Sequence, residues 1–343
     1  MKRCITEIFA KWLLTMLLVV LVVGCTSEFD EWDTGVNIEF TTPYLQDMEI
    51  QTKALSGYDS TIQVSTTMGV FVSGMQNEST VTYNGSSWES SLKLDPATYN
   101  IYSYIPKRNG VTLRGNVITF PDVPFIMSEE ILLSSGAVAE TVTKDKTPSD
   151  KTASLVKNTY SIKVESAEDT ENYVTFMMDR VMAKVNLNFK VHEKYSKIRT
   201  IKIKEVTLKP AAGDYQSVNI ACTMNDGSEI SYSRSPGSAV DNKVSFSITD
   251  DGLVLNDTSE KSVGRFYSVP GVQNNVVMTV KYDVYDKAET LVRENQTVTN
   301  SSIKLIDTGT LTRAKEYKLN VNIVPTYLYS LSDTDKESVM LVQ

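Results

Sequence analysis

Residues 184–192 read KVNLNFKVH, in which polar and apolar side chains alternate without interruption. A period of two over such a length predicts a β-strand that has one face in a hydrophobic core and the other in solvent. The same alternation recurs elsewhere in the chain, at 36–40, 244–248, 276–284 and 318–323. No segment shows a helical period longer than about three turns. The sequence therefore predicts an all-β protein.

Tight turns separate these strands. Dipeptides of Asn or Asp followed by Gly, which favour a positive φ, lie at 84–85, 109–110, 226–227 and 251–252. Short strands at this spacing predict β-sandwich domains, and 343 residues suffice for two of them. We expect the boundary near Thr170, because residues 173–191 open a new series of strands after a polar stretch at 141–157.

The first residues of the chain have the pattern of a cleavable export signal. Lys2, Arg3 and Lys11 precede an apolar run at 13–23 that only Thr15 interrupts. This run is about half of the roughly 20 residues that a membrane-spanning helix needs. A basic start, a short apolar run and small residues at its end are typical of a signal peptide.

The end of this signal, residues 21–25 (LVVGC), resembles the lipobox of bacterial lipoproteins. In such proteins the cysteine thiol receives a diacylglycerol before cleavage on its N-terminal side. We therefore expect residues 1–24 to be a signal peptide and Cys25 to carry the lipid. An ordinary signal peptide followed by a chance cysteine is the alternative. Several acyl chains, at about 0.8 kcal/mol per buried methylene, hold a protein firmly on a membrane.

An acidic segment follows Cys25. Residues 26–33 (TSEFDEWD) show neither a helical nor a strand period. They resemble the acidic tag with which some Gram-negative bacteria send lipoproteins to the outer face of the outer membrane, although a plain solvated linker has the same composition. The first interpretation makes the mature chain, 343 − 24 = 319 residues, an outer-membrane lipoprotein at the cell surface. Residues 25–53 then form the tether and the first strand.

The composition argues against several classes of function. Acidic side chains outnumber basic ones, 42 to 34, and the chain has no basic tract or basic–aromatic stripe. Nucleic acid is therefore not an expected partner. With Cys4 in the signal and Cys25 lipidated, Cys222 is left as a single thiol, which excludes an intramolecular disulfide. We expect Cys222 to be a small buried hydrophobe rather than a reactive thiol.

Motifs for catalysis or cofactor binding are absent from the sequence. His192 is the single histidine. It lies two and four residues after Lys190 and Asn188, which places it with them on the polar face of the predicted strand. No Gly-x-Ser-x-Gly motif supplies a nucleophilic serine, His and Cys are too few for a zinc site, and no glycine-rich phosphate loop opens a helix. The adjacent acids Glu129 and Glu130 are interpreted as surface carboxylates rather than a catalytic pair. We expect no enzyme activity, no cofactor and no metal.

Three short stretches of the first half read MGVFV, YNGSSW and YNIYSYIP. They are similar to the G-V-F, Y-N-G-x-x-W and Y-A-Y-Y-P core of the fimbrillin-type proteins, which are subunits of the type V pili of gut and oral Gram-negative bacteria. The full set of similar motifs spans nearly the whole chain, at 52–54 (TKA), 68–72, 83–88, 99–106, 182–185 (MAKV), 267–270 (YSVP) and 317–329. Two positions depart from the family: it often has arginine at Lys53 and frequently histidine at Arg180.

The resemblance implies a fold and a mode of assembly. The fold would be two transthyretin-like β-sandwich domains in tandem, at 54–170 and 171–343. A trypsin-like protease would cut after a basic residue, here between Lys53 and Ala54, and so remove the lipid and the first strand. A strand from another pilin subunit would then fill the groove, pairing its backbone groups and covering its apolar slot. The protein would be a structural subunit of a surface pilus that serves adhesion.

The C-terminus is the candidate for the donated strand. Pro325 cannot donate a ladder hydrogen bond and ends the strand at 319–324. Close to the carboxyl end the chain has four consecutive apolar residues, Val339, Met340, Leu341 and Val342. Termini are usually polar, so this run indicates a strand. It either closes the chain's own sandwich or docks into a neighbour's groove, where a strand buried on both faces is continuously apolar.

Two other classes of protein remain open at this stage. A glycan-binding surface lipoprotein would also be all-β, with Trp32, Trp88 and the tyrosines at 99–104 as its exposed aromatic face. A surface hydrolase would need catalytic residues that the sequence does not offer. Binding to a panel of polysaccharides would separate a glycan-binding protein from a pilus subunit.

Lipidation of Cys25 can be tested directly. Replacing Cys25 with Ala removes the thiol that accepts the lipid, so the variant should lose labelling by a fatty-acid analogue and accumulate as unprocessed precursor. Metabolic labelling followed by gel electrophoresis measures both effects. Undiminished labelling of the variant would contradict the lipoprotein assignment.

Overall fold

The computed structural model describes residues 35–45, 64–211, 217–238, 242–249, 252–271, 275–306, 310–325 and 339–342. Strands make up most of the regular structure in these ranges, which confirms the all-β class. The helical elements of this part are short: α2 (Glu193–Ser196) and the 3-10 helix η2 (Thr152–Ser154). Within the described ranges, no helix has the length and apolar character needed to cross a membrane.

Most strands of the first half belong to one sheet that closes into a ring, called here the N-terminal ring. Its strands are β1 (Val36–Phe40), β2 (Tyr44–Leu45), β3 (Thr67–Val72), β4 (Ser79–Tyr83), β5 (Trp88–Ser90), β6 (Lys93–Leu94), β7 (Thr98–Ile105), β11 (Leu132–Thr143), β12 (Ser161–Lys163) and β13 (Thr170–Arg180). The order of pairing is β13-β11-β7-β3-β4-β5-β1, and β1 pairs with β13 to close the ring. The first half is thus a closed ring of strands around one hydrophobic core.

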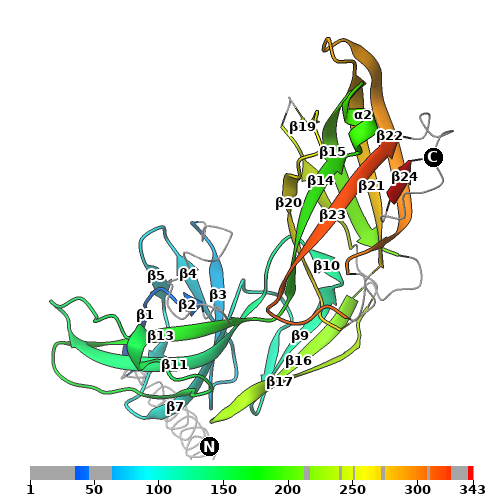
Figure 1. Cartoon of the computed structure of the whole chain (residues 1–343). Helices are drawn as coiled ribbons and strands as arrows, with labels where there is room; N and C mark the ends of the chain where they lie inside the picture. The colour runs from blue at the N-terminus through cyan, green and yellow to red at the C-terminus, as the bar shows by residue number, and fades with distance from the viewer. Residues whose placement is uncertain are drawn as a thin grey trace, which may run out of the picture.

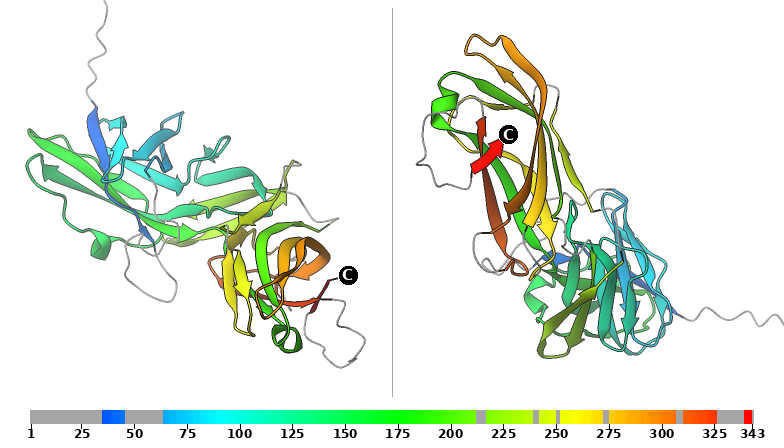
Figure 2. Two further views of the ribbon diagram at one scale, coloured as in Figure 1. Left: turned by 90° about the horizontal axis from the view of Figure 1, so that it is seen from above. Right: turned by 90° about the vertical axis from the view of Figure 1, so that its right-hand side faces the viewer.

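The second half is built from two sheets that share a second core (Figure 1). One sheet contains β10 (Ile126–Met127), β20 (Lys261–Ser268), β14 (Ala183–Val191), β23 (Glu316–Pro325) and β24 (Val339–Val342). The other contains β18 (Val244–Ser247), β15 (Thr200–Pro210), β21 (Asn275–Tyr285), β22 (Leu291–Lys304) and β19 (Leu253–Leu255). Figure 2 shows this C-terminal sandwich projecting away from the N-terminal ring.

Residues 184–191 of the stretch KVNLNFKVH lie in β14, at the centre of the first of these sheets. His192, expected on the polar face of this strand, instead follows its end and begins the turn into α2. The apolar residues Val185, Leu187 and Phe189 of β14 are fully buried, whereas the intervening polar residues are partly exposed. The prediction of a half-buried strand from the period of two is confirmed here. β14 runs parallel to β23 along its length, so the buried rows of the two strands face the same core.

A third sheet joins the two halves. It combines a hairpin of the first half, β8 (Thr112–Arg114) and β9 (Val117–Pro124), with a hairpin of the second, β16 (Ser217–Asn225) and β17 (Ser228–Pro236). β9 pairs with β16, so the ladder between them connects segments far apart in the sequence. This bridging sheet lies between the N-terminal ring and the C-terminal sandwich in Figure 1.

The turn of the second hairpin reaches the first half. Gly227 has a φ of 73°, which suits glycine, and its amide donates to the carbonyl oxygen of Asn158 (2.8 Å). The neighbouring carboxylate of Asp226 accepts a hydrogen bond from the amide of Tyr160 (3.1 Å). The Asp-Gly pair predicted as a turn therefore also fastens the bridging sheet to the first half.

The division between the halves falls later than expected. Thr170, where the sequence suggested a boundary, begins β13, but this strand pairs with β11 along its whole length and belongs to the N-terminal ring. The chain passes into the C-terminal sandwich between Arg180 and Ala183, where β14 starts. Because β13 and β14 follow each other almost without a break, their sequence pattern gives no sign that they lie in different sheets.

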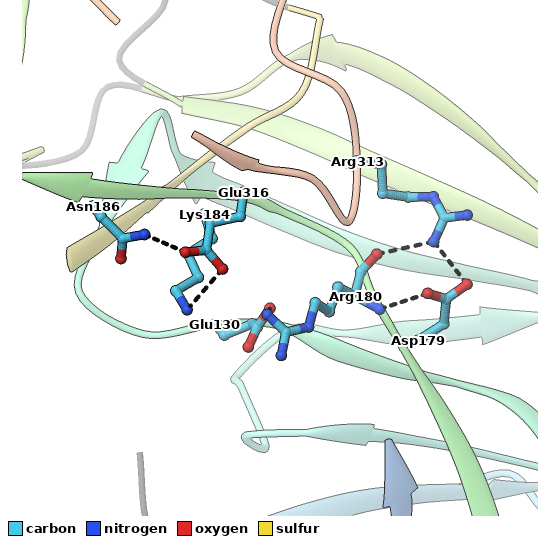
Figure 3. Close-up of polar contacts among 7 residues, drawn as sticks. All are labelled: Glu130, Asp179, Arg180, Lys184, Asn186, Arg313 and Glu316. Carbon is cyan, nitrogen blue, oxygen red and sulfur yellow. Dashed lines mark hydrogen bonds and ion pairs between the residues drawn. The ribbon is translucent and has the colours of Figure 1, made fainter. Parts of the chain in front are cut away.

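Charged side chains meet at this crossing point (Figure 3). The buried carboxylate of Asp179 accepts a hydrogen bond from the amide of Arg180 (2.8 Å), and its Oδ2 lies 2.8 Å from Arg313 Nη1. Arg313 also donates to the carbonyl oxygen of Arg180 (2.9 Å), and its guanidinium lies 4.4 Å from the ring centre of Tyr232 in β17. Arg313 precedes β23, so one side chain links the sandwich, the ring and the bridging sheet.

Glu130, which we expected to be a surface acid like Glu129, is buried at this junction. It is 1% exposed, and its Oε1 lies 3.5 Å from Nη1 of Arg180, which is itself buried. Burying a carboxylate is costly unless an opposite charge accompanies it, and Arg180 supplies that charge. The sequence pattern around Glu130 contains no sign of this partner, which lies on another strand.

Removing Arg313 should test whether this junction stabilises the fold. Arg313→Ala leaves the buried Asp179 carboxylate with the more distant Lys157 (3.8 Å), so we expect the free energy of unfolding to fall by about 3 kcal/mol. Urea unfolding followed by tryptophan fluorescence measures the change. A second substitution, Asp179→Asn, should restore part of the loss because it removes the unpaired charge.

The matched control is Lys163→Ala, which breaks the exposed pair between Lys163 and Glu165 (2.7 Å). Exposed pairs contribute little, so this variant should unfold like the unchanged protein. Equal behaviour of Arg313→Ala and Lys163→Ala would show that the junction pair does not stabilise the fold.

Candidate functional site

The first strand is the element that closes the N-terminal ring. β1 pairs in parallel with β13 on one side and in antiparallel fashion with β5 and β6 on the other. The amide of Ile38 donates to Leu92 O (2.9 Å), and that of Thr41 donates to Val174 O (3.0 Å). Figure 1 shows β1, in dark blue, beside β13. Without β1, the facing edges of β13 and β5 would have unpaired backbone groups.

β1 also supplies part of the core of the ring. Ile38 is fully buried, Phe40 is 4% exposed, and the ring of Phe40 stacks on that of Phe176 in β13 at 5.9 Å between centroids. Just beyond, Leu45 of β2 is buried against the same core. Burial of such a side chain contributes about 1.5–3 kcal/mol. The part of the ring that β1 and β2 cover, called here the slot, is therefore strongly apolar.

The YNGSSW motif builds the wall of this slot. The side-chain oxygen of Asn84 accepts from the amides of Ser86 and Ser87 (both 2.8 Å), which closes the turn between β4 and β5. The turn brings Trp88 to the start of β5, directly opposite Phe40 of β1. Trp88 is 2% exposed and packs on Tyr83. The motif thus positions the strand that holds β1.

The MGVFV motif has a steric explanation. Gly69 in β3 lies against the ring of Tyr104, which belongs to the YNIYSYIP segment in β7. A Cβ added at Gly69 would overlap the ring of Tyr104 and the carboxylate of Glu78. These two motifs therefore pack against each other, and they position β3 and β7 in the middle of the ring.

The outer face of β1 is acidic. Glu39 lies between Glu89 on β5 and Glu171 on β13, and burial followed by the charges of Glu171 and Glu89 raises the pKa of the Glu39 carboxyl. Tyr173, opposite Glu39 on β13, donates to Glu171 Oε2 (2.8 Å). Burial, that hydrogen bond and the charges of Glu171 and Glu39 raise the pKa of Tyr173 to about 12.

Three of the predicted site residues lie outside the described residues: Cys25, Lys53 and Ala54. β2 ends at Leu45 and the description resumes at Val64. The peptide bond between Lys53 and Ala54 therefore belongs to the connection between β2 and the rest of the ring. Lipidation and cleavage remain predictions.

The predicted tail strand is present as β24, Val339–Val342. It lies at the edge of its own sheet and pairs in parallel with β23, from Asn322 opposite Val339 to Pro325 opposite Val342. This is the arrangement expected if the tail closes the chain's own sandwich. One edge of β24 is paired within the described part of the chain, and its last residue lies one position from the C-terminus.

The remaining chemically active side chains have structural surroundings. Cys222 is fully buried, as expected, and burial raises the pKa of its thiol. His192 is partly buried and caps α2, where its Nδ1 accepts from the amide of Lys194 (3.3 Å). Among the described residues, no cluster of His, Cys, Asp and Glu has the size needed to hold a metal ion.

The aromatic face proposed for a glycan-binding protein is not formed by the described residues. Trp88, Tyr102 and Tyr104 are 2%, 3% and 0% exposed. Trp88 packs in the core of the N-terminal ring, whereas Tyr102 and Tyr104 lie on the opposite face of β7 and pack in the second core. Tyr99 is partly buried against the core of the ring. Trp32, the other aromatic considered, lies outside the described residues.

Comparison with known proteins identifies similar solved structures. No protein-family model and no curated protein matches the chain. A fimbrial protein from Bacteroides vulgatus is 13% identical, with a TM-score of 0.42, over 84% of this chain and 95% of that one. A candidate cell adhesion protein from Bacteroides uniformis is 12% identical, with a TM-score of 0.42, over 84% and 93%. Among solved structures, the chain is thus similar to a fimbrial protein and to a candidate cell adhesion protein of Bacteroides, at low sequence identity.

The contribution of β1 to the ring can be measured with Phe40→Ala. The substitution removes the ring that packs on Phe176 and faces Trp88, so it should lower the free energy of unfolding by about 3–5 kcal/mol. Thermal and urea unfolding of the purified protein give the value. Val156→Ala is the control, because Val156 is 61% exposed and its truncation should change little. A ring that tolerates Phe40→Ala as easily would mean that β1 is not part of its core.

Proposed function

We propose that the chain is a structural subunit of a bacterial surface pilus that serves adhesion and assembles by strand exchange. The observation that carries the proposal is the position of β1. It is the closing strand of the N-terminal ring, it holds Ile38 and Phe40 in the core, and it stands next to the N-terminal tether in the sequence. A single cut after the strand would therefore free both the strand and everything before it.

The proposed sequence of events begins with export. The precursor is lipidated at Cys25 and reaches the outer membrane, with β1 in place in the ring. A trypsin-like protease then cuts between Lys53 and Ala54, and β1 and β2 leave with the lipid. The open slot exposes the edges of β13 and β5 and an apolar floor, and a strand from another pilin subunit restores both kinds of contact.

The donated strand in this proposal is the tail, Val339–Val342. It lies at a sheet edge and pairs with its own chain through β23, so moving it breaks one parallel ladder rather than the centre of a sheet. Its apolar side chains suit a slot from which Ile38 and Phe40 have departed. In the same proposal, the N-terminal ring and the C-terminal sandwich correspond to the two transthyretin-like domains implied by the resemblance.

The test is to cleave the mature protein and follow its assembly. Limited trypsin treatment should produce a chain that begins at Ala54, and the cleaved protein should form ladders of polymers on gels run without boiling. A variant lacking Val339 to Gln343 should be cut in the same way and remain folded, but it should stay monomeric. Lys53→Gln should be neither cut at this position nor able to polymerise.

Two results would contradict the proposal. One is cleavage confined to the Lys-rich segment at 144–157 with Lys53 left intact. The other is a protein that begins at Ala54 and stays monomeric at high concentration. Unfolding of the tail-deleted variant would instead assign the tail to its own sandwich and remove the donor role from it.

A further inference from the structure

We propose that β1 is held in the ring against a built-in electrostatic repulsion, so that it is bound more tightly in mildly acidic than in neutral solution. The repulsion arises at Glu39, in the middle of the outer face of β1. The proposal rests on the proposed function only for its biological role, in which the repulsion would ease the release of β1 after cleavage. The repulsion itself is a property of the folded chain.

The pairing register places like charges on the same face of neighbouring strands. In the antiparallel pair of β1 and β5, Phe40 stands opposite Trp88, and the residues next to this pair, Glu39 on β1 and Glu89 on β5, both point to the outer face. In the parallel pair with β13, Glu39 stands opposite Tyr173, and Glu171 is the next residue on the same face of β13. Glu39 therefore has a carboxylate on the strand to either side.

Little on this face offsets these charges. No ion pair between described residues includes Glu39, Glu89 or Glu171. Glu89 accepts from the neutral amide of Asn84 (2.6 Å), and Glu171 accepts from the hydroxyl of Tyr173. On β6 the charged residue is Lys93, whose backbone stands opposite Asn37, two residues before Glu39.

The position of Glu39 strengthens the repulsion. Its side chain is partly buried, where solvent screens charges less than at an exposed site. Like charges directly opposite on neighbouring strands are destabilising. The inward neighbours Ile38 and Phe40 fix the register, so β1 cannot slip by one residue without turning its apolar side chains to solvent.

The direction of the pH effect follows from linkage. Burial and the two neighbouring carboxylates raise the pKa of Glu39 in the folded chain, whereas in a detached β1 this group titrates at its ordinary value. The docked strand therefore binds the proton more tightly. The stabilisation is fully present below the ordinary pKa and is lost as the pH rises through the raised pKa. As the pH rises, β1 is held by its apolar contacts against a growing repulsion.

The test uses hydrogen exchange in the intact mature chain, which requires neither cleavage nor assembly. Glu39→Gln keeps the shape of the side chain and removes its charge. At pH 7.5 the amides of β1 should exchange about two- to five-fold more slowly in the variant than in the unchanged protein. At pH 5 the difference should shrink, because Glu39 is then partly protonated in the unchanged protein. Amides of β21, in the other half, should exchange equally in both proteins.

Two further variants make the test specific. Glu89→Gln should also slow the exchange of β1 at pH 7.5. In the double variant Glu39→Gln with Glu89→Gln, the gain in protection should be smaller than the sum of the two single gains, because neutralising either carboxylate already removes the repulsion between them. Glu229→Gln, at an exposed position of β17, is the control and should leave β1 unchanged.

Exchange of β1 that is unchanged or faster in Glu39→Gln at pH 7.5 would overturn the proposal, as would strictly additive effects of the two substitutions. Failure of the pilus proposal would look different: the cleaved chain would stay monomeric while Glu39→Gln still slowed the exchange of β1. The two proposals therefore fail separately.

Discussion

A sheet edge must be paired or covered, and the floor of an apolar core must be closed; in the N-terminal ring one short strand meets both requirements. β1 pairs with the backbone N–H and C=O groups at the edges of β13 and β5, and it places Ile38 and Phe40 in the core. Strands β13, β11, β7, β3, β4 and β5 are joined in that order by antiparallel ladders, so they form a sheet that is continuous except for this gap. The ring is thus sensitive to the loss of one peripheral segment at the start of the chain.

β13 links this gap to the rest of the molecule. One of its edges pairs with β11 and the other with β1 and β2. Its last residues, Asp179 and Arg180, enter the polar junction that Arg313 completes from the C-terminal sandwich. The next strand, β14, forms the centre of the sheet whose edge is β24. The candidate acceptor slot and the candidate donor strand therefore belong to sheets joined by a single continuous stretch of backbone.

Strands such as β14 and β1 could be predicted from the sequence because apolar and polar residues alternate along them. The turn at Asn84 was also visible, because Asn-Gly has a local conformational preference. Pairing between distant strands leaves no such local trace. The bridging sheet, the membership of β13 in the ring and the partner of Glu130 could not be predicted for this reason. Trp88 was visible as part of a motif, but whether it pointed outward or against Phe40 depended on the register of β5.

The bridging sheet also has a mechanical consequence. In a fibre joined through the ring of one subunit and the tail of the next, tension would enter each subunit at one half and leave at the other. The connections between the halves include the backbone between Arg180 and Ala183, the ladders of β9 with β16 and of β10 with β20, and the contacts of Arg313. Beside the ladder of β9 with β16, Asp122 is hydrogen-bonded to Asn219 and Asn116 to Asn225, so each bond joins residues about 100 positions apart in the sequence. A pull must therefore break these ladders before it can draw out the intervening chain, so the load is shared and no single peptide segment acts as the hinge.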